Sequence, residues 1–318
     1  MTFSKIIGQP KAVQLLSRAL AGNRLAHGYL FTGPEGVGKR TTAAALAAFL
    51  LCNAPQEKPC GRCTGCLKFL SGNHPDYLTI RPDGAMIKID QIRALKKDLR
   101  FPPFEAGMRI VCIEDVQTMR REAANSLLKI LEEPPPDNLL LLIASETQPL
   151  LPTILSRCQV IPFAPLTMEQ ACTVIRDNDP ELPPEDARAL AVLTGGCPGR
   201  VHQLHSDDVL DLRNNCLESL SAGGRNEAES VELALDLAGR MAELKDGLET
   251  LFDLLAIAFK EQMVSDLCAA EPAAARERWS LQQLSDMVQA VDSARRDLVA
   301  HCNRGLVCEV LLLELFSR

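Results

Sequence analysis

A glycine-rich run that ends in lysine is the first stretch of the chain whose residues could do chemistry. Residues 33–39 read GPEGVGK, and the positions expected to meet phosphate are Gly33, Gly36, Gly38 and Lys39. Such a loop, placed between a strand and a helix, surrounds a phosphate chain with backbone N–H groups and an ammonium. The alternative is a glycine turn that holds no ligand.

The residue after the lysine is Arg40, where loops of this type normally carry the Ser or Thr hydroxyl that binds Mg²⁺. Thr41 comes one residue late, and a helical step of about 100° would turn its hydroxyl away from the metal. The loop is therefore predicted to be able to hold ATP, with Mg²⁺ binding doubtful and hydrolysis poorly supported.

A carboxylate pair, Glu114 and Asp115, directly follows the apolar run 109–113. In nucleotide hydrolases, such a pair at a strand end holds the Mg²⁺ shell with its first member and activates water with its second. The usual order is Asp then Glu, and the inverted order here changes the reach of both carboxylates where positioning controls rate. Exposed carboxylates at strand ends are common, so the pair alone is weak evidence.

Four of the twelve cysteines are clustered in the pattern C-x7-C-x2-C-x2-C. They are Cys52, Cys60, Cys63 and Cys66. Four thiolates at this spacing can complete the tetrahedral shell of a structural Zn²⁺. An iron–sulfur cluster is the main alternative, although position 70, where its fourth cysteine would fall, is Leu70. Disulfides are the other alternative and are disfavoured in a reducing cytosol.

The elements that must position these residues alternate between strand and helix in the first half of the chain. We expect strands over 28–31, 109–113 and 139–143, with the last followed by Ser145. Helices are expected over 41–51, between Asp90 and the prolines at 102–103, and over 122–133. Asp90 is the expected N-cap of the second of these helices. Thr167 and Gln170 form a capping-box start for another, and beyond residue 207 only helical spacing is found.

Composition excludes several classes. The chain has 318 residues, is 47% hydrophobic and carries a formal net charge of −7. This charge argues against a protein that grips nucleic acid alone, because such affinity comes from many Lys and Arg contacts to phosphate. No apolar stretch is long enough for a membrane span, and the start lacks the features of a signal peptide. A soluble, cytoplasmic protein is expected.

The order of the motifs resembles bacterial clamp-loader AAA+ subunits of DNA polymerase III. The shared features are IIGQ at 6–9, the glycine loop, the four-cysteine insertion, the acidic pair, SLLKILEEPP at 126–135 and SRC at 156–158. The resemblance covers about the first 205 residues. It implies an α/β plus all-α fold with a P-loop AAA+ domain on a parallel sheet over 1–165, carrying a zinc insertion at about 52–66. A small helical lid over 166–206 and a helical collar over 207–318 would follow.

The resemblance also implies roles for three polar residues. Arg157 would reach across a subunit interface, as an arginine finger, to the γ-phosphate of ATP bound by a neighbour. Ser145 and Arg200 would be sensors near the γ-phosphate. The simpler alternatives are a surface ion pair for Arg157, a turn residue for Ser145 and a helix-face cation for Arg200. The implied partners are the gamma/tau ATPase subunits and the delta subunit in a five-membered ring, with the sliding clamp and primer–template DNA reached through the complex.

Two functions remain open. The first is a largely non-hydrolysing subunit that braces the ring and supplies Arg157, and the second is an ATP-hydrolysing subunit of the gamma/tau type. Arg40, the inverted acidic pair and the absence of a long C-terminal extension favour the first. A zinc-dependent nucleic-acid binder unrelated to clamp loading fits poorly with the acidic charge.

Overall fold

The computed structural model describes residues 3–55, 57–105, 107–145, 152–204, 206–222, 226–244, 247–268 and 279–317. It separates into two compact units, Met1–Gln170 and Ala171–Arg318. Among the described residues, no helix is long and apolar enough to cross a membrane.

The first unit is built on a five-stranded sheet in the order β2-β3-β4-β1-β5, with every neighbouring pair parallel. The strands are β1 (Gly28–Thr32), β2 (Tyr77–Ile80), β3 (Arg109–Ile113), β4 (Asn138–Ala144) and β5 (Gln159–Pro162). Every residue of β1, β3 and β4 is buried, as expected for parallel strands covered on both faces. The expected strands and the parallel sheet are confirmed.

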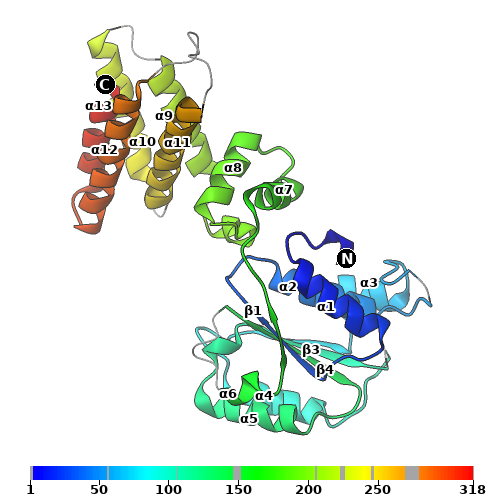
Figure 1. Cartoon of the computed structure of the whole chain (residues 1–318). Helices are drawn as coiled ribbons and strands as arrows, with labels where there is room; N and C mark the ends of the chain where they lie inside the picture. The colour runs from blue at the N-terminus through cyan, green and yellow to red at the C-terminus, as the bar shows by residue number, and fades with distance from the viewer. Residues whose placement is uncertain are drawn as a thin grey trace. The chain divides into compact units, whose positions relative to one another are not determined.

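Helices cover both faces of this sheet (Figure 1). On one face lie α1 (Pro10–Ala21), α2 (Lys39–Leu50) and α3 (Thr64–Leu70), and on the other α4 (Ile89–Asp98), α5 (Arg121–Glu132) and α6 (Pro152–Leu155). Short 3₁₀ helices η1 and η2 span Phe3–Lys5 and Val116–Thr118. The core beneath α4 and α5 joins Leu95 and Leu127 to alternate strand residues such as Leu140. Burial of these apolar side chains holds the strands in place. The strand ends that carry the polar residues are therefore held in place too.

Two helix starts differ from expectation. Helix α2 begins at Lys39 rather than at Thr41. Helix α4 begins at Ile89 with Lys88 as its N-cap residue, so the prediction that Asp90 caps this helix is wrong. The side chain of Gln91 accepts a hydrogen bond from the Lys88 backbone N–H at 2.9 Å, which satisfies the helix start from within the first turn.

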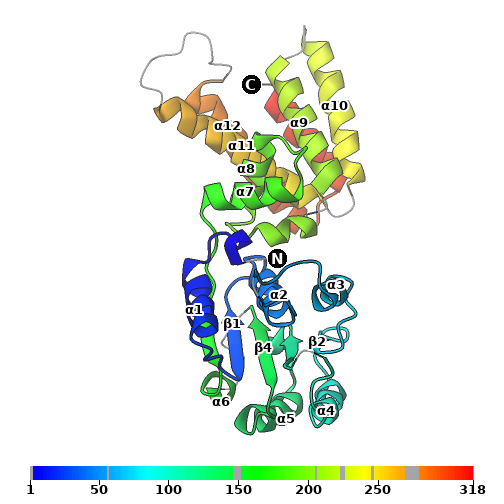
Figure 2. The same cartoon turned by 90° about the vertical axis from the view of Figure 1, so that its right-hand side faces the viewer.

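All the secondary structure in the described residues of the second unit is helical. Its helices are α7 (Met168–Asn178, which begins in the first unit), α8 (Pro184–Leu193), η3 (Pro198–Gln203), α9 (Ser206–Ala222), α10 (Glu227–Glu243), α11 (Leu248–Cys268), α12 (Leu281–Val299) and α13 (Arg304–Phe316). Helix α10 packs on α13 and α11 on α12, while α9 and α10 lie side by side (Figure 2). The expected start of α7 is confirmed, because Thr167 and Gln170 exchange hydrogen bonds between side chain and backbone.

Candidate functional site

The glycine loop connects β1 to α2 in conformations that need glycine. Gly33 has φ +139°, and a Cβ on it would lie 2.2 Å from the carbonyl oxygen of Phe163. Gly38, the N-cap of α2, is left-handed with φ +98°. A side chain at either position would be strained, so the backbone itself places the loop N–H groups at the start of α2, where an anion is favoured.

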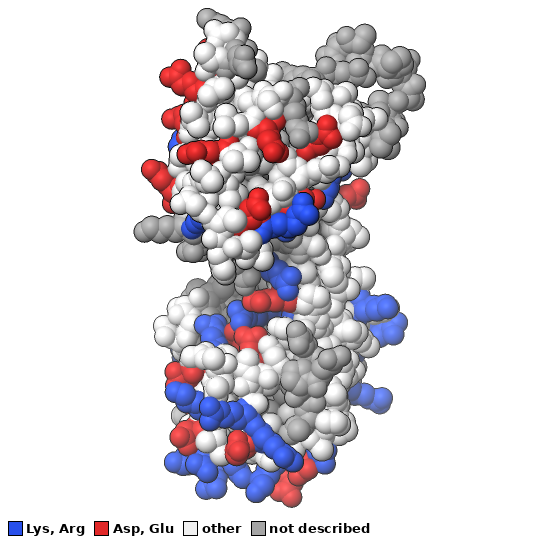
Figure 3. Space-filling model, turned by 90° about the vertical axis from the view of Figure 1, so that its left-hand side faces the viewer, with Lys and Arg blue, Asp and Glu red and all other residues white. Residues whose placement is uncertain are grey.

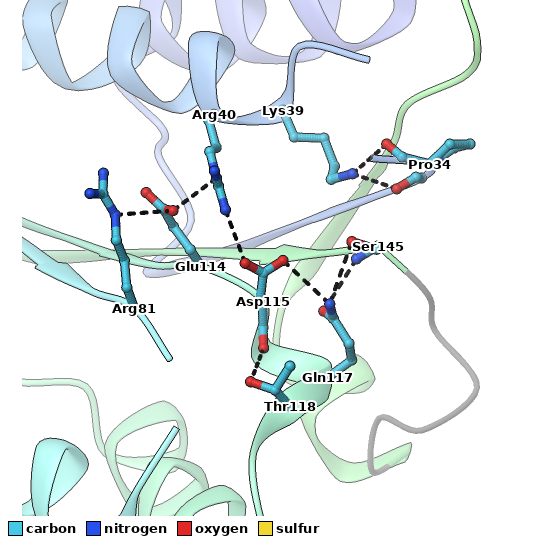
Figure 4. Close-up of polar contacts among 10 residues, drawn as sticks. Pro34, Lys39, Arg40, Arg81, Glu114, Asp115, Gln117, Thr118 and Ser145 are labelled. Atoms are coloured by element: carbon cyan, nitrogen blue, oxygen red, sulfur yellow. Dashed lines mark hydrogen bonds and ion pairs between the residues drawn. The ribbon is translucent and has the colours of Figure 1, made fainter. Parts of the chain in front are cut away.

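Lys39 lies at the first position of α2 and is buried. Its Nζ donates to the carbonyl oxygens of Gly33 at 2.5 Å and Pro34 at 2.6 Å, as drawn in Figure 4. A phosphate entering the loop would exchange these neutral acceptors for charged ones, which form stronger hydrogen bonds.

Arg40 points from α2 to the acidic pair at the end of β3 (Figure 4). Its Nε lies 2.8 Å from Oε2 of Glu114, and its Nη2 donates to Oδ2 of Asp115 at 3.0 Å. Arg81, which follows β2, places its Nε 3.2 Å from the same Glu114 oxygen. That oxygen is buried and meets both guanidinium groups as ion pairs, without the alignment of a hydrogen bond. The two carboxylates therefore meet two guanidinium cations.

This arrangement fills the space where a P-loop hydrolase holds its metal. The Ser or Thr that would bind Mg²⁺ is replaced by Arg40, and the carboxylates that would complete the metal's shell are paired with Arg40 and Arg81. A divalent cation there would have to displace Arg40 or lie against its positive charge. The prediction that Mg²⁺ binding is doubtful stays a prediction.

Gln117 joins the acidic pair to the polar residue at the end of β4. Its Nε2 lies 3.3 Å from Oδ1 of Asp115 and 3.4 Å from Oγ of Ser145, and its Oε1 accepts from the Ser145 backbone N–H at 3.2 Å. Asp115 itself is left-handed with φ +53°, and its carbonyl oxygen accepts two hydrogen bonds from Thr118. Sequence reasoning missed both Gln117 and Arg81. The position of Arg81 beyond a parallel strand was the available signal, because the ends of neighbouring strands share one edge of the sheet.

Gln9, from the IIGQ motif, fixes the other side of the glycine loop. Its buried side chain donates to the carbonyl oxygens of Val37 at 3.2 Å and Ala164 at 2.7 Å. It also accepts from the Ala164 backbone N–H at 3.3 Å. This one amide therefore ties the loop to the segment that leaves β5.

Other predicted residues lie elsewhere. Thr41 is exposed on α2, and the buried hydroxyl is that of Thr42, which donates to the Gly38 carbonyl oxygen at 2.9 Å. Arg157 follows α6, where its Nη2 forms an ion pair with Glu132 at 2.8 Å. Arg200 is exposed on η3 in the second unit.

The four clustered cysteines converge. Their sulfur atoms all lie within 4.8 Å of one another, and the Sγ atoms of Cys52 and Cys63 are 3.9 Å apart. Zinc–sulfur bonds of about 2.3 Å in a tetrahedron place sulfur atoms roughly 3.8 Å apart. The cluster can hold one metal ion of this size.

Backbone N–H groups already favour thiolates in this cluster. The N–H groups of Cys60, Cys63 and Cys66 each lie 3.4 Å from the sulfur of the preceding cysteine. The N–H of Cys66 lowers the pKa of Cys63 to about 6, whereas burial raises the pKa of Cys66 to about 12. A bound dication would deprotonate that thiol too.

The parallel sheet, the glycine loop at the end of β1 and the acidic pair directly after β3 define the P-loop class of protein. Within it, the chain belongs to the family described as "DNA polymerase III, delta subunit", whose model matches residues 8–167.

Curated relatives agree with this assignment. The chain is 38% identical over 205 residues to the DNA polymerase III subunit delta' of Bacillus subtilis (strain 168), a match that covers 64% of this chain and 62% of the relative. It is 38% identical over 202 residues to the subunit delta' of Pseudomonas aeruginosa, covering 61% and 60%. The B. subtilis subunit tau is 30% identical over 252 residues, covering 77% of this chain and 40% of that protein. The match therefore spans about three fifths of the delta' relatives.

Proposed function

We propose that this chain is a clamp-loader subunit of DNA polymerase III that does not hydrolyse ATP efficiently and supplies Arg157 to the ATP site of a neighbouring subunit. The contact of Arg40 with both Glu114 and Asp115 is the observation that carries the proposal. Phosphoryl transfer needs Mg²⁺ to neutralise charge and a free carboxylate to orient water. Here the carboxylates are paired with guanidinium groups.

The proposed partners follow from the relatives. Subunits named delta' and tau are both similar to this chain, which supports a ring that also contains gamma/tau ATPase subunits and the delta subunit in the cytoplasm. The sliding clamp and primer–template DNA would be reached through that complex. On the face seen in Figure 3, the Lys and Arg side chains of the first unit are interspersed with Asp and Glu. This mixed surface does not favour a stand-alone nucleic-acid binder.

The expected domains keep their proposed roles. The P-loop domain would bind nucleotide through Lys39, with Ser145 and Arg200 as sensors. The helices after residue 165 would form a lid to about residue 206 and a ring-forming collar beyond it. The buried apolar faces of α11 to α13 suit a helical collar.

We propose that the cysteine cluster holds a structural Zn²⁺. The four convergent sulfur atoms match a closed tetrahedral shell. The ion would make the segment between α2 and α3 a local folding unit. It would take no part in the chemistry at the phosphate loop.

An ATP-hydrolysing gamma/tau-type subunit is the competing function. The intact lysine and the identity to tau support it, and the filled metal position counts against it.

ATP turnover distinguishes the two functions. The purified chain should show negligible hydrolysis, and the reconstituted ring should lose part of its DNA- and clamp-stimulated hydrolysis when Arg157→Ala replaces the wild-type chain. An arginine finger contributes roughly 10³ to 10⁵ in rate at its own interface, and the other interfaces keep theirs. Turnover by the chain alone that Lys39→Ala abolishes would support the ATPase. Equal ring rates with equal assembly would make Arg157 a surface ion-pair residue.

A further inference from the structure

Glu132, the last residue of α5, contacts the guanidinium of Arg157. Its Oε1 lies 2.8 Å from Nη2, with 46% of the Glu132 side chain and 34% of the Arg157 side chain exposed. Arg157 Nη1 donates to the carbonyl oxygen of Thr153 at 3.0 Å and lies 3.2 Å from Oγ of Ser156. Helices α5 and α6 lie side by side (Figure 1), so the guanidinium is held from both.

The contacts of the guanidinium are made by Nη1 and Nη2 and not by Nε. An arginine side chain has five N–H donors, and these three acceptors lie at Nη1 and Nη2. Within the described residues, the Nε–H has no acceptor, and Nη2 meets only the Glu132 carboxylate, as an ion pair that is not aligned as a hydrogen bond. These two nitrogens form the side of the planar fork that can meet two phosphate oxygens at once.

We propose that Glu132 is a positioning residue for Arg157, holding the guanidinium so that its Nε side faces the neighbour's γ-phosphate. The inference rests on the proposed function, because it assigns Glu132 a role only if Arg157 acts on that phosphate.

A positioning role accounts for the contact between Glu132 and Arg157 better than a role in folding stability does. An ion pair this exposed adds little to folding, so stability alone gives Glu132 no clear role. A long side chain loses rotamer freedom when it engages a ligand, and prior ordering removes most of that loss from the binding step.

The same carboxylate could oppose the finger by competing with phosphate for the guanidinium. The contact geometry favours positioning, because Thr153 and Ser156 meet Nη1 and Glu132 meets Nη2 only as an ion pair, while Nε has no acceptor among the described residues. The two roles predict opposite signs for the effect of removing Glu132.

The test uses the reconstituted ring with Glu132→Ala, Glu132→Gln, Arg157→Ala or the double variant Glu132→Ala/Arg157→Ala in place of the wild-type chain. Glu133→Ala is the matched control, because this neighbouring glutamate forms no ion pair with the residues that the structure describes. Assembly is checked by size-exclusion chromatography.

We expect Glu132→Ala to lower the rate at the interface that receives Arg157 by roughly 2- to 10-fold, the factor that corresponds to ordering one long side chain, and so to lower part of the stimulated kcat of the ring. KM and assembly should stay unchanged, and the loss should be smaller than that of Arg157→Ala. Glu132→Gln, which keeps an oxygen acceptor, should recover part of the rate. The double variant should lose no more than Arg157→Ala alone, and Glu133→Ala should match wild type.

Three results would overturn the inference. If Arg157→Ala lowers the rate but Glu132→Ala leaves it equal or raises it, the positioning role fails and the proposed function stands. If Glu132→Ala lowers the rate as much in the Arg157→Ala background as in wild type, Glu132 acts through another group. If Arg157→Ala has no effect, the proposed function fails and this inference fails with it.

Discussion

The Nε of Arg40 lies 2.8 Å from Oε2 of the buried Glu114. This contact joins the first turn of α2 to the end of β3. In P-loop hydrolases, a metal ion joins these two elements. The guanidinium is a permanent cation. The positive charge between the glycine loop and the acidic pair therefore comes from Arg40 of this chain.

Replacing Arg40 with Thr should make nucleotide binding depend on Mg²⁺. The change restores the hydroxyl and frees Glu114 and Asp115 for the metal. Calorimetric titration with a non-hydrolysable ATP analogue should give similar affinity in Mg²⁺ and EDTA for the wild-type chain. For Arg40→Thr, affinity should be roughly tenfold tighter in Mg²⁺, a gain of about 1.4 kcal/mol.

Lys39→Ala is the control for that titration and should weaken binding in both buffers. If the wild-type chain binds the ATP analogue only in Mg²⁺, the proposal that Arg40 takes the place of the metal is wrong, because the metal would have to displace Arg40.

The cysteine cluster should hold one zinc ion per chain, measured by elemental analysis after purification without chelator. Cys60→Ser should lose the ion, while Cys302→Ser, at an exposed cysteine outside the cluster, should retain it. Removing zinc should loosen the 52–66 segment, seen as faster hydrogen exchange there, and leave the sheet protected. Iron with visible absorbance, or no metal in the wild-type chain, would refute the zinc proposal.

Arg109→Ala should destabilise the first unit by about 3 kcal/mol, the scale of removing one member of a buried ionic network. The Arg109 guanidinium is buried and donates to the carbonyl oxygens of Asp98, Phe101 and Pro102 at 2.7–3.0 Å. Its loss leaves these acceptors, and the Asp76 carboxylate 3.9 Å away, without that partner. Urea denaturation followed by circular dichroism measures the change. Arg100→Ala, at an exposed arginine, serves as the control. Equal stability of the two variants would show that the Arg109 contacts do not stabilise the first unit.

The first unit should lose stability as the pH falls below about 6.5, through His74. This side chain is buried, and its Nδ1 accepts a hydrogen bond from the Asp76 backbone N–H at 3.1 Å. Burial lowers the pKa of His74 from its ordinary value of 6.5. As the pH falls, the unfolded chain therefore takes up this proton at a higher pH than the folded chain does. The contribution of neutral His74 to stability is fully present above about pH 6.5 and is lost as the pH falls from there toward the lowered pKa.

Thermal unfolding between about pH 7.5 and 5.5 measures this dependence. His74→Asn keeps an acceptor but does not titrate, so its melting temperature should vary less with pH. An unchanged slope in the variant would assign the dependence to other groups.

The sequence by itself determined three of the five strands, β1, β3 and β4, and the loop between β1 and α2, but not β2 or β5. The strands β1, β3 and β4 were predictable because each is an unbroken apolar run that must be buried on both faces. The glycine spacing was sufficient to predict the loop between β1 and α2, and the cysteine spacing was sufficient to predict that the four sulfur atoms converge. Each group lies within a short segment of the chain. The start of α4 was predicted wrongly, because Gln91 satisfies that helix end in place of Asp90.

Only the tertiary structure decided which groups meet. Arg40 and Glu114 are far apart in the sequence, as are Glu132 and Arg157, and Gln117 and Ser145. No local pattern encodes these pairs. They depend on parallel strands ending at one edge of the sheet and on helices packed against its faces, so that burial of apolar side chains sets the distances between polar ones.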